Sequence, residues 1–174
     1  NGYAGAQFDL GFMYMHGDGV AVDYDEAICL YRMAANQGHA LAQYNLGLLY
    51  DSGELVKQDY TEAIRWYLLA ASQGYFAAQY NLGLMYFWGK GIQQDYTEAL
   101  RWYRLAGEQG DALAQRDVGL IYSNGWGVPQ DYAEAARWYL LAAERGDAQA
   151  QLNLGARYAK GQGVQRDLVR SEEH

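Results

Sequence analysis

Residues 38–73 read GHALAQYNLGLLYDSGELVKQDYTEAIRWYLLAASQ, and similar copies of this 36-residue stretch follow one another along the chain. Three residue types mark the interval of 36 most clearly: Gly11, Gly47, Gly83, Gly119 and Gly155; Asp23, Asp59, Asp95, Asp131 and Asp167; Tyr14, Tyr50, Tyr86, Tyr122 and Tyr158. A fixed period of this length is typical of stacked copies of one supersecondary structure. The repeated residues should therefore build the scaffold, and function should depend on residues that differ between repeats.

The first half of the stretch predicts a helix over residues 39–52. Ala42, Leu46, Leu49 and Tyr50 fall on one side of a helix that turns by about 100° per residue. Gly47 lies in the middle of this helix, where glycine costs about 1 kcal/mol relative to alanine. Its recurrence in every repeat predicts a point where another helix comes too close for a Cβ atom.

Glycines after this helix predict a turn, because glycine readily adopts positive φ. The pairs are Gly17-x-Gly19, Gly89-x-Gly91, Gly125-x-Gly127 and Gly161-x-Gly163, whereas Leu55 replaces the second glycine in the second repeat. That turn should therefore differ from the others. A β-branched residue follows each turn and is expected to plug into the core: Val20, Val56, Ile92, Val128 and Val164.

A second helix is predicted to begin after Asp59. Asp59 and Glu62 match a capping box, in which the aspartate accepts a backbone N–H and the glutamate reaches back to the N–H of the aspartate. The same pairs recur at Asp23/Glu26, Asp95/Glu98 and Asp131/Glu134. The packing stripe of this helix is expected to comprise Ala63, Tyr67, Ala70 and Ala71, with Trp66 beside it.

We expect a single repeat array over residues 1–174, with repeats at 2–37, 38–73, 74–109 and 110–145 and a partial repeat at 146–174. After Asp167 the pattern breaks off, since Leu168 and Arg170 stand where Tyr and Glu would be expected. Neither end carries the polar capping repeat that such arrays need for solubility. This predicts a longer native protein, or self-association through the uncapped terminal repeats.

Composition narrows the classes of partner. The net charge is −8 and no segment concentrates Lys and Arg, which argues against nucleic acid or an anionic membrane as the main partner. No run of about 18 apolar residues predicts a transmembrane segment. Cys29 is the only cysteine, so neither an intrachain disulfide nor a cysteine-based zinc site is possible. Its place in a helical segment predicts a small buried hydrophobic residue.

The sequence offers no convergent set of catalytic groups. His16, His39 and His174 lie in different contexts without metal-ligand spacing, and the recurring carboxylates are helix caps. No nucleophile stands beside a candidate base. We therefore predict no enzymatic activity, no cofactor and no metal site.

The repeat pattern also resembles a known family. A-x-Q-x-x-L-G-x-x-Y in the first helix, G-x-G-V in the turn and D-Y-x-E-A-x-x-W-Y-x-x-A-A in the second helix are similar to Sel1-like repeats, relatives of the tetratricopeptide repeat. The resemblance covers nearly the whole chain. It implies an all-α, right-handed superhelical solenoid whose first helices line the concave side. It also implies a bacterial adaptor that holds partner proteins together, with an exported location favoured over the cytoplasm.

The first helices carry an apolar face opposite their core face, which contact with water alone would not require. The candidate partner-binding residues on this face are Phe8, Phe12, Met15, His16, Tyr44, Leu48, Tyr80, Leu84, Phe87 and Trp88. Phe87 and Trp88 stand out because the equivalent pairs are Met-His, Asp-Ser, Ser-Asn and Ala-Lys. Trp126 is expected to be exposed for a similar reason, since Asp18, Glu54, Lys90 and Gln162 occupy its position elsewhere.

We therefore expect a partly aromatic concave groove, centred on the first three repeats, that binds an extended segment or a helix of a partner protein. Arg116 and Asn124 would flank the groove, and Asn45 and Asn81 would bond the backbone of the partner. Three alternatives stay open. Tyr44, Tyr80, Leu48, Leu84 and Leu120 could instead contact neighbouring repeats; exposed tryptophans could stack on a glycan or peptidoglycan fragment; and the array could be a structural spacer or a designed consensus-like array.

Overall fold

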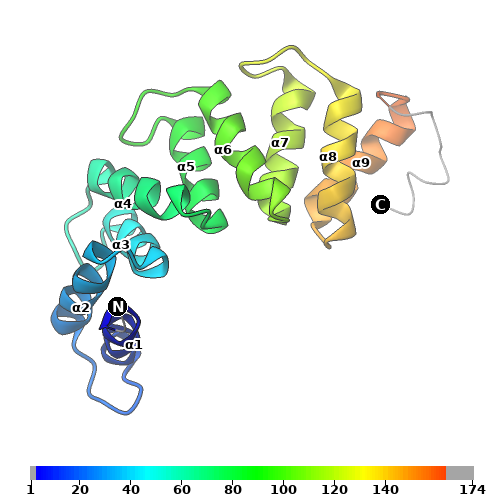
Figure 1. The fold of residues 1–174 in the computed structure, drawn as a ribbon. Helices are drawn as coiled ribbons and strands as arrows, with labels where there is room; N and C mark the ends of the chain where they lie inside the picture. Colours follow the sequence, from blue (N-terminus) through cyan, green and yellow to red (C-terminus); the bar gives the residue numbers. More distant parts are fainter. Residues whose placement is uncertain (1–2, 164–174) are drawn as a thin grey trace. The chain divides into compact units, whose positions relative to one another are not determined.

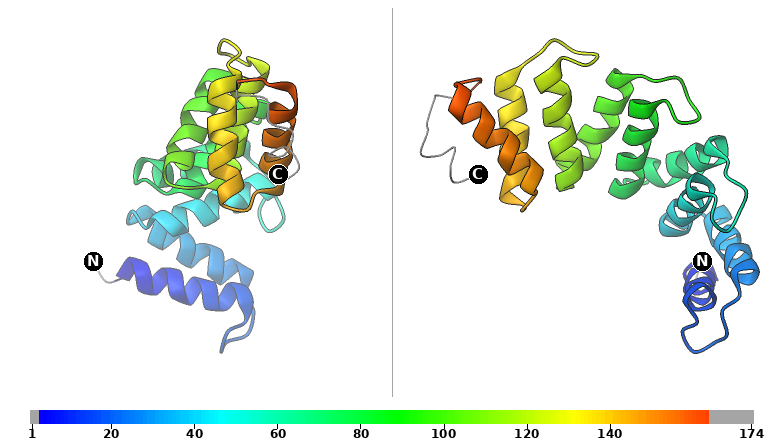
Figure 2. Two further views of the ribbon diagram at one scale, coloured as in Figure 1. Left: turned by 90° about the vertical axis from the view of Figure 1, so that its right-hand side faces the viewer. Right: turned by 180° about the vertical axis from the view of Figure 1, so that it is seen from behind.

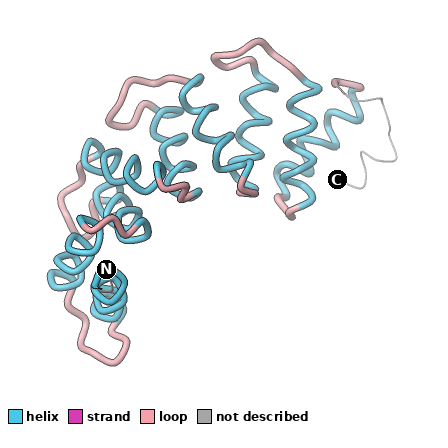
Figure 3. The backbone as a smooth tube through the Cα atoms, viewed as in Figure 1, coloured by secondary structure: helices cyan, strands magenta, loops and turns pink. Residues whose placement is uncertain are grey.

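The computed structural model describes residues 3–163, and these residues form helices joined by turns (Figures 1 and 3). Each of the first four repeats contributes two helices, and the fifth contributes one within the described residues. The bounds are α1 Tyr3–His16, α2 Tyr24–Asn36, α3 Ala40–Ser52, α4 Tyr60–Ser72, α5 Phe76–Trp88, α6 Tyr96–Glu108, α7 Ala112–Asn124, α8 Tyr132–Glu144 and α9 Ala148–Lys160. This confirms the predicted all-α class. Val164, Asp167 and His174 lie outside the described residues.

The chain divides into two compact units. The first unit runs up to Leu82 and includes Lys90–Ile92, and the second comprises Gly83–Gly89 and the residues from Gln93 onward. The division therefore falls inside α5. In the first unit, α1 packs on α2, α2 on α3 and α3 on α4. In the second unit, α6 packs on α7, α7 on α8 and α8 on α9 (Figure 2).

Within each repeat, a tyrosine of the second helix lies against the recurring glycine of the first helix. A Cβ atom added to Gly119 would stand 2.7 Å from two ring carbons of Tyr139 and 3.1 Å from the carbonyl oxygen of Ala135. At Gly11 the same test gives 3.0 Å to the ring of Tyr31. The predicted close approach is confirmed, and its cause is a tyrosine ring that fills the space of the missing side chain.

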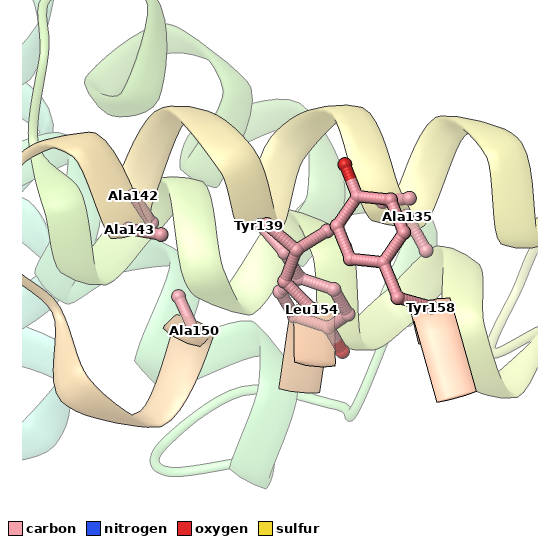
Figure 4. Packing of buried hydrophobic residues seen from close by; sticks show 8 residues of the cluster. Ala135, Tyr139, Ala142, Ala143, Ala150, Leu154 and Tyr158 are labelled. Carbon is pink, nitrogen blue, oxygen red and sulfur yellow. The ribbon is translucent and has the colours of Figure 1, made fainter. Parts of the chain in front are cut away.

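Small residues around these rings complete the core. Tyr139 is 1% exposed and packs with the alanines of α8 and with Leu154 and Tyr158 of α9 (Figure 4). The equivalent tyrosines are equally enclosed: Tyr31, Tyr67 and Tyr103. The packing stripe predicted for the second helix is likewise buried: Ala63, Trp66, Tyr67, Ala70 and Ala71.

The turn after each first helix depends on glycine with positive φ, as predicted. Both glycines of each pair have positive φ: Gly17, Gly19, Gly89, Gly91, Gly125, Gly127, Gly161 and Gly163. In the turn of the second repeat only Gly53 has positive φ, at 72°. Leu55, in place of the second glycine, does not, since every described residue with positive φ is a glycine. That turn therefore closes without a second left-handed residue, at Leu55.

The capping prediction was half right. Asp59 accepts hydrogen bonds from the backbone N–H groups of Thr61 and Glu62 at 3.0 and 3.1 Å. The N–H of Asp59, however, donates to the carbonyl of Tyr50 at 3.0 Å, so Glu62 has no N–H to reach back to. Glu62 instead accepts from Arg65 at 3.0 Å. The aspartate therefore caps the second helix and also ties it to the end of the first.

The same arrangement recurs in the other repeats that the structure describes fully. The N–H groups of Asp23, Asp95 and Asp131 donate to the carbonyls of Tyr14, Tyr86 and Tyr122 at 2.9–3.0 Å. This explains why aspartate and tyrosine share one period: each pair joins the two helices of a repeat through the backbone.

A buried glutamine joins each repeat to the one before it. Gln43 donates from its side chain to the carbonyl of Ala35 at 3.0 Å, and Gln115 donates to the carbonyl of Gly107 at 2.8 Å. Both carbonyls belong to the last turn of a second helix, and each also accepts a backbone N–H, from Gly38 and Gly110 respectively. The glutamine of the A-x-Q pattern therefore adds a side-chain hydrogen bond to the helix end of the preceding repeat.

The prediction for Cys29 was wrong, since this residue is exposed. It lies on α2 beside the buried residues Ile28 and Leu30 but points away from them. Its counterparts in the later repeats are Arg65, Arg101 and Arg137, all exposed. The comparison of equivalent positions would therefore have placed Cys29 on the surface.

We expect Gly119→Ala to lower the free energy of unfolding. Overpacking costs about 1–3 kcal/mol, while the better helix propensity of alanine returns about 1 kcal/mol. Gly5→Ala is the matched control, because nothing lies within 4 Å of its added Cβ atom. Urea denaturation followed by circular dichroism measures both. Equal stability of the two variants would contradict the proposed contact with Tyr139.

The capping correction gives a second prediction. Asp59→Ala should lower the free energy of unfolding by about 1 kcal/mol, because the N-terminus of α4 loses its acceptor. Glu62→Ala should change the stability by less than about 0.5 kcal/mol, because it removes only an exposed ion pair. An equal loss of unfolding free energy in the two variants would show that Glu62 also caps the helix, as in a full capping box.

Burial raises the pKa of Tyr31, Tyr67 and Tyr139, and this predicts loss of stability in alkali. In the unfolded chain tyrosine releases its proton near pH 10, whereas the folded chain holds it to higher pH. Stability is therefore fully present below about pH 10 and falls as the pH rises above it.

Urea unfolding at several alkaline pH values tests this expectation. Tyr67→Phe should flatten the fall in stability above about pH 10, because one raised pKa is removed. Tyr3→Phe, at a tyrosine that is 75% exposed, is the control. Parallel pH profiles for the wild type and Tyr67→Phe would contradict the prediction.

Candidate partner-binding surfaces

The first unit contains a pocket of about 530 Å³ at the C-terminal ends of α1 and α3. Residues from both first helices, from α2 and from two turns line it: Met15, His16, Tyr31, Asn45, Leu48, Leu49, Asp51, Ser52, Glu54 and Lys90. Four of the predicted binding residues, Met15, His16, Asn45 and Leu48, are therefore brought together. We name this cavity the α1–α3 pocket.

The apolar wall of the α1–α3 pocket consists of Met15, Leu48 and Leu49. Leu48 is 38% exposed, whereas Met15 and Leu49 are half-buried. Beside them the ring of His16 stacks on Phe12 with centroids 4.0 Å apart, and Phe12 is 42% exposed. The apolar surface thus continues from the pocket along α1.

The polar side of the α1–α3 pocket carries Asp51, Ser52, Glu54 and Lys90. The hydroxyl of Tyr67 lies 3.5 Å from Oδ2 of Asp51, and the ammonium of Lys90 lies 6.0 Å from the ring centroid of Tyr60. None of the ion pairs formed among residues 3–163 includes Asp51, Glu54 or Lys90. The pocket therefore presents charged groups beside an apolar wall.

The asparagines predicted to bond a partner make hydrogen bonds within the scaffold. The side chain of Asn45 bonds the hydroxyl of Tyr31, and that of Asn81 bonds the hydroxyl of Tyr67. Burial raises the pKa of both tyrosines, and these hydrogen bonds oppose the rise. A buried hydroxyl needs such a partner. Asn45 and Asn81 therefore join neighbouring repeats, and their bonding to the backbone of a partner stays a prediction.

Phe8 is also part of the core rather than of a binding surface, being 9% exposed. Its ring stacks on Tyr31 with centroids 5.4 Å apart and on His39 at 4.8 Å. The ring of Phe8 therefore fills the space between α1, the middle of α2 and the N-terminus of α3. The stripe of apolar residues on α1 therefore begins with a core residue and is exposed further along, at Phe12.

Tyr44 contacts the following repeat, as the first of the alternatives proposes for this residue. Tyr44 is half-buried, and its ring centroid lies 5.0 Å from that of Tyr75 and 6.0 Å from that of Tyr67. Tyr80, Leu84 and Leu120 are half-buried as well. Leu48 is the exposed member of this set.

In the second unit, Phe87 and Trp126 form an aromatic cluster. The ring of Phe87 meets Tyr96 and Trp126 edge to face, with centroids 5.2 and 5.4 Å apart. Trp126 stacks on Tyr96 at 5.7 Å and is half-buried, so its predicted exposure was wrong. Lys90 lies over Tyr60 at the equivalent position. The turn residue therefore covers the first tyrosine of the preceding second helix.

Trp88 stays available for binding, since it is 64% exposed. Its ring meets Phe87 edge to face with centroids 4.9 Å apart. Phe87 is held in turn by the cluster around Trp126. The two residues of the predicted pair thus have different roles. Phe87 packs against the ring of Trp88, and Trp88 presents an exposed aromatic surface.

The two polar residues predicted to flank the groove differ in their surroundings. Arg116 is half-buried and pairs with Asp117 at 2.9 Å and Asp147 at 3.5 Å, so its charge is already compensated. Asn124 is exposed, and its amide donates to the carbonyl of Leu120 at 2.8 Å. Only Asn124 presents an exposed polar side chain.

Six residues that line the pocket were not among the predicted binding residues: Tyr31, Leu49, Asp51, Ser52, Glu54 and Lys90. The signal for Glu54 and Lys90 was present, because the turn position they occupy differs in every repeat. The same comparison singled out Trp126 but was not applied to the charged residues. Tyr31 and Leu49 belong to the repeating pattern and gave no such signal.

None of the helices within residues 3–163 has the length and apolar character needed to cross a bilayer.

Comparison with known proteins identifies the repeat. The profile of the Sel1 repeat matches residues 4–39, 40–75, 76–111, 112–147 and 148–174. A protective antigen of uropathogenic Escherichia coli with an SLR fold is 41% identical, with a TM-score of 0.95 over 99% of this chain and 37% of that protein. The chain thus spans just over a third of the length of that relative.

Two further solved structures are similar. A Sel1 repeat protein from Oxalobacter formigenes is 41% identical, with a TM-score of 0.93 over 98% of this chain and 70% of that one. Cysteine rich protein B of Helicobacter pylori shares the fold at 22% identity, with a TM-score of 0.57 over 76% of this chain and 96% of that one. No curated protein matches the chain.

Sel1 repeat proteins are generally scaffolds that bind other proteins, and the fold is generally non-catalytic. The matches extend over almost the whole chain, and the structure has the helix pairs of a Sel1 repeat solenoid. The chain therefore belongs to the Sel1 repeat family.

Proposed function

We propose that this chain is a non-enzymatic interaction scaffold that binds a segment or helix of a partner protein through non-repeating side chains at the ends of its first helices. The α1–α3 pocket is the observation that carries this proposal. Its walls include Met15, His16, Asp51 and Glu54, at positions where the repeats differ from one another, beside the exposed Leu48.

The division of labour between repeated and non-repeated residues supports the proposal. The repeated Tyr, Gly, Ala and Gln side chains are buried or bonded within the fold, as at Tyr67, Gly119 and Gln115. Leu48 is 38% exposed although it is a large apolar residue. An exposed apolar group beside a pocket is typical of a contact surface.

One apolar side chain in the pocket would contribute about 1.5–3 kcal/mol by burial, which is too little for a stable complex. Phe12 extends the surface along α1, where its ring is 42% exposed and stacks on His16. We infer that a partner contacts both the pocket and this part of α1. Extended segments and amphipathic helices both make contacts of this kind.

Trp88 supplies a separate contact in the second unit. It is 64% exposed, and its edge-to-face contact with Phe87 restrains the ring before any partner binds. A restrained aromatic ring loses little conformational entropy on binding, and tryptophan is enriched among residues that dominate binding energy. We propose that Trp88 contacts the partner protein.

A glycan or peptidoglycan fragment is the second candidate ligand, and the exposed ring of Trp88 is the observation in its favour. Trp126 does not add a second platform, because its ring stacks on Tyr96. Titration with cell-wall fragments while tryptophan fluorescence is recorded tests this candidate, and Trp88→Ala should abolish any change.

Capture of proteins from a lysate of the producing organism, with quantitative mass spectrometry, tests the proposed scaffold. Leu48→Arg should reduce the captured partner by about tenfold or more, since one buried charge or lost apolar contact costs at least about 1.4 kcal/mol. Trp88→Ala should reduce it severalfold.

Leu68→Arg is the matched control, because Leu68 is 40% exposed and lies on the second helix α4, away from the pocket lining. Melting temperatures should agree among the three variants and the wild type. If Leu48→Arg and Leu68→Arg retain the same partner equally, the pocket does not bind it.

A further inference from the structure

The α1–α3 pocket contains two carboxylates without a cationic partner. Asp51 and Glu54 both line it, and no ion pair formed within residues 3–163 includes either of them. Some other acidic residues of this fold are paired, as Glu62 is with Arg65 and Asp147 with Arg116, whereas others such as Asp25 form no ion pair within residues 3–163. The two pocket carboxylates therefore remain available to a cation from outside the chain.

The scaffold does not require acids at these two positions. Asp51 corresponds to Met15, Phe87, Ser123 and Ala159 in the other repeats, and Glu54 corresponds to Asp18, Lys90, Trp126 and Gln162. Repeat proteins tolerate such variation where a side chain does not take part in packing. The acid at Asp51 is thus particular to the second repeat, whereas the position of Glu54 also holds an acid in the first repeat, Asp18. Asp51 and Glu54 border the same cavity.

Asp51 is held in place by the fold. It is half-buried, and its Oδ2 atom lies 3.5 Å from the hydroxyl of Tyr67. The carbonyl of Asp51 also accepts a hydrogen bond from the side chain of Gln58 at 2.7 Å. Its carboxylate therefore has a fixed position at the wall, whereas Glu54 is exposed at the rim.

Lys90 is the cation that lines the pocket, and it is turned toward an aromatic ring. Its ammonium lies 6.0 Å from the ring centroid of Tyr60, and it forms no ion pair with either carboxylate among the described residues. The pocket has two carboxylates and one ammonium, and the chain has a net charge of −8, so the pocket favours a cationic ligand.

We infer that the α1–α3 pocket binds an arginine side chain from a basic segment of the partner protein. The inference rests on the proposed scaffold function and names the chemistry of its partner. The aliphatic stem of the arginine packs along Met15, Leu48 and Leu49, and its guanidinium reaches Asp51 and Glu54. Arginine suits such a site because its planar fork binds carboxylates with paired hydrogen bonds while its stem covers apolar surface.

Electrostatic steering strengthens the choice of a basic partner. A chain with charge −8 attracts a basic segment before contact, and charge pairs across an interface raise the rate of association more than they raise affinity. Lysine would satisfy the charge but not the paired geometry. An acidic residue or a free carboxylate would meet only Lys90, next to two repelling groups.

Three blocked peptides test the inference by titration into the ¹⁵N-labelled chain. Their central residue is arginine, citrulline or glutamate between two alanines; citrulline has the shape of arginine without its charge. We expect the arginine peptide to shift the backbone amide signals of Ser52, Gly53 and Glu54. The affinity for the citrulline peptide should be lower by up to about fivefold, since the charge contribution is lost.

Two variants of equal charge separate a local effect from a general one. Asp51→Asn with Glu54→Gln should abolish the preference for arginine over citrulline. Asp25→Asn with Glu144→Gln changes the net charge equally at two exposed residues outside the pocket, and should preserve the preference. Loss of the preference in both double variants would mean that net charge alone selects the peptide, which would overturn the inference.

Other outcomes overturn it in different ways. Equal binding of the arginine and citrulline peptides would show that the apolar wall alone selects the ligand. Stronger binding of the glutamate peptide, lost in Lys90→Ala, would assign the site to a carboxylate. No shift with any peptide at about 20 mM, above a millimolar dissociation constant, would exclude an arginine site. The capture experiment with Leu48→Arg judges the scaffold function separately.

Discussion

The contact between a helical glycine and a tyrosine ring is the constraint on which the rest of this structure depends. Because Gly119 has no side chain, the ring of Tyr139 lies directly on α7 and the two helices of the repeat come close together. The same contact at Gly11 and Tyr31 fixes the spacing of another helix pair. Alanines, Leu46 and Trp66 are buried together with the ring of Tyr31, so the tyrosine shares the core with other large side chains.

Hydrogen bonds then fix the order and direction of the helices. The N–H of Asp59 joins the two helices of a repeat through the carbonyl of Tyr50, and the side chain of Gln43 joins a repeat to the end of the previous one at Ala35. The first bond gives the carbonyl of Tyr50, at a helix end, a partner outside its own helix. The second is added to a carbonyl that also accepts the N–H of Gly38. The residues that repeat are thereby engaged within the fold, and the ends of the first helices are left for side chains such as Leu48, Glu54 and Trp88.

Periodicity predicted the helices, their caps and the glycine contact, because each of these depends on a residue that must recur at one position. Periodicity did not predict whether a particular side chain contacts the scaffold or stays available to a partner. Asn45 looked like a ligand for a partner, but its side chain bonds Tyr31, and Trp126 looked exposed although it stacks on Tyr96. The α1–α3 pocket depends on residues far apart in sequence, Met15 and Lys90 among them, and only packing brings these together.

A scan of all single substitutions, scored for folding by resistance to proteolysis, measures the separation of scaffold from contact surface most directly. We predict that substitutions prevent folding at positions that recur every 36 residues: those of Gly119 and Tyr139 and those of the aspartate caps such as Asp131. Substitutions should be tolerated at Leu48, Glu54 and Trp88, whose side chains line a pocket or are exposed. If these three positions proved as intolerant as the glycine and tyrosine positions, they would be part of the scaffold and the account would be wrong.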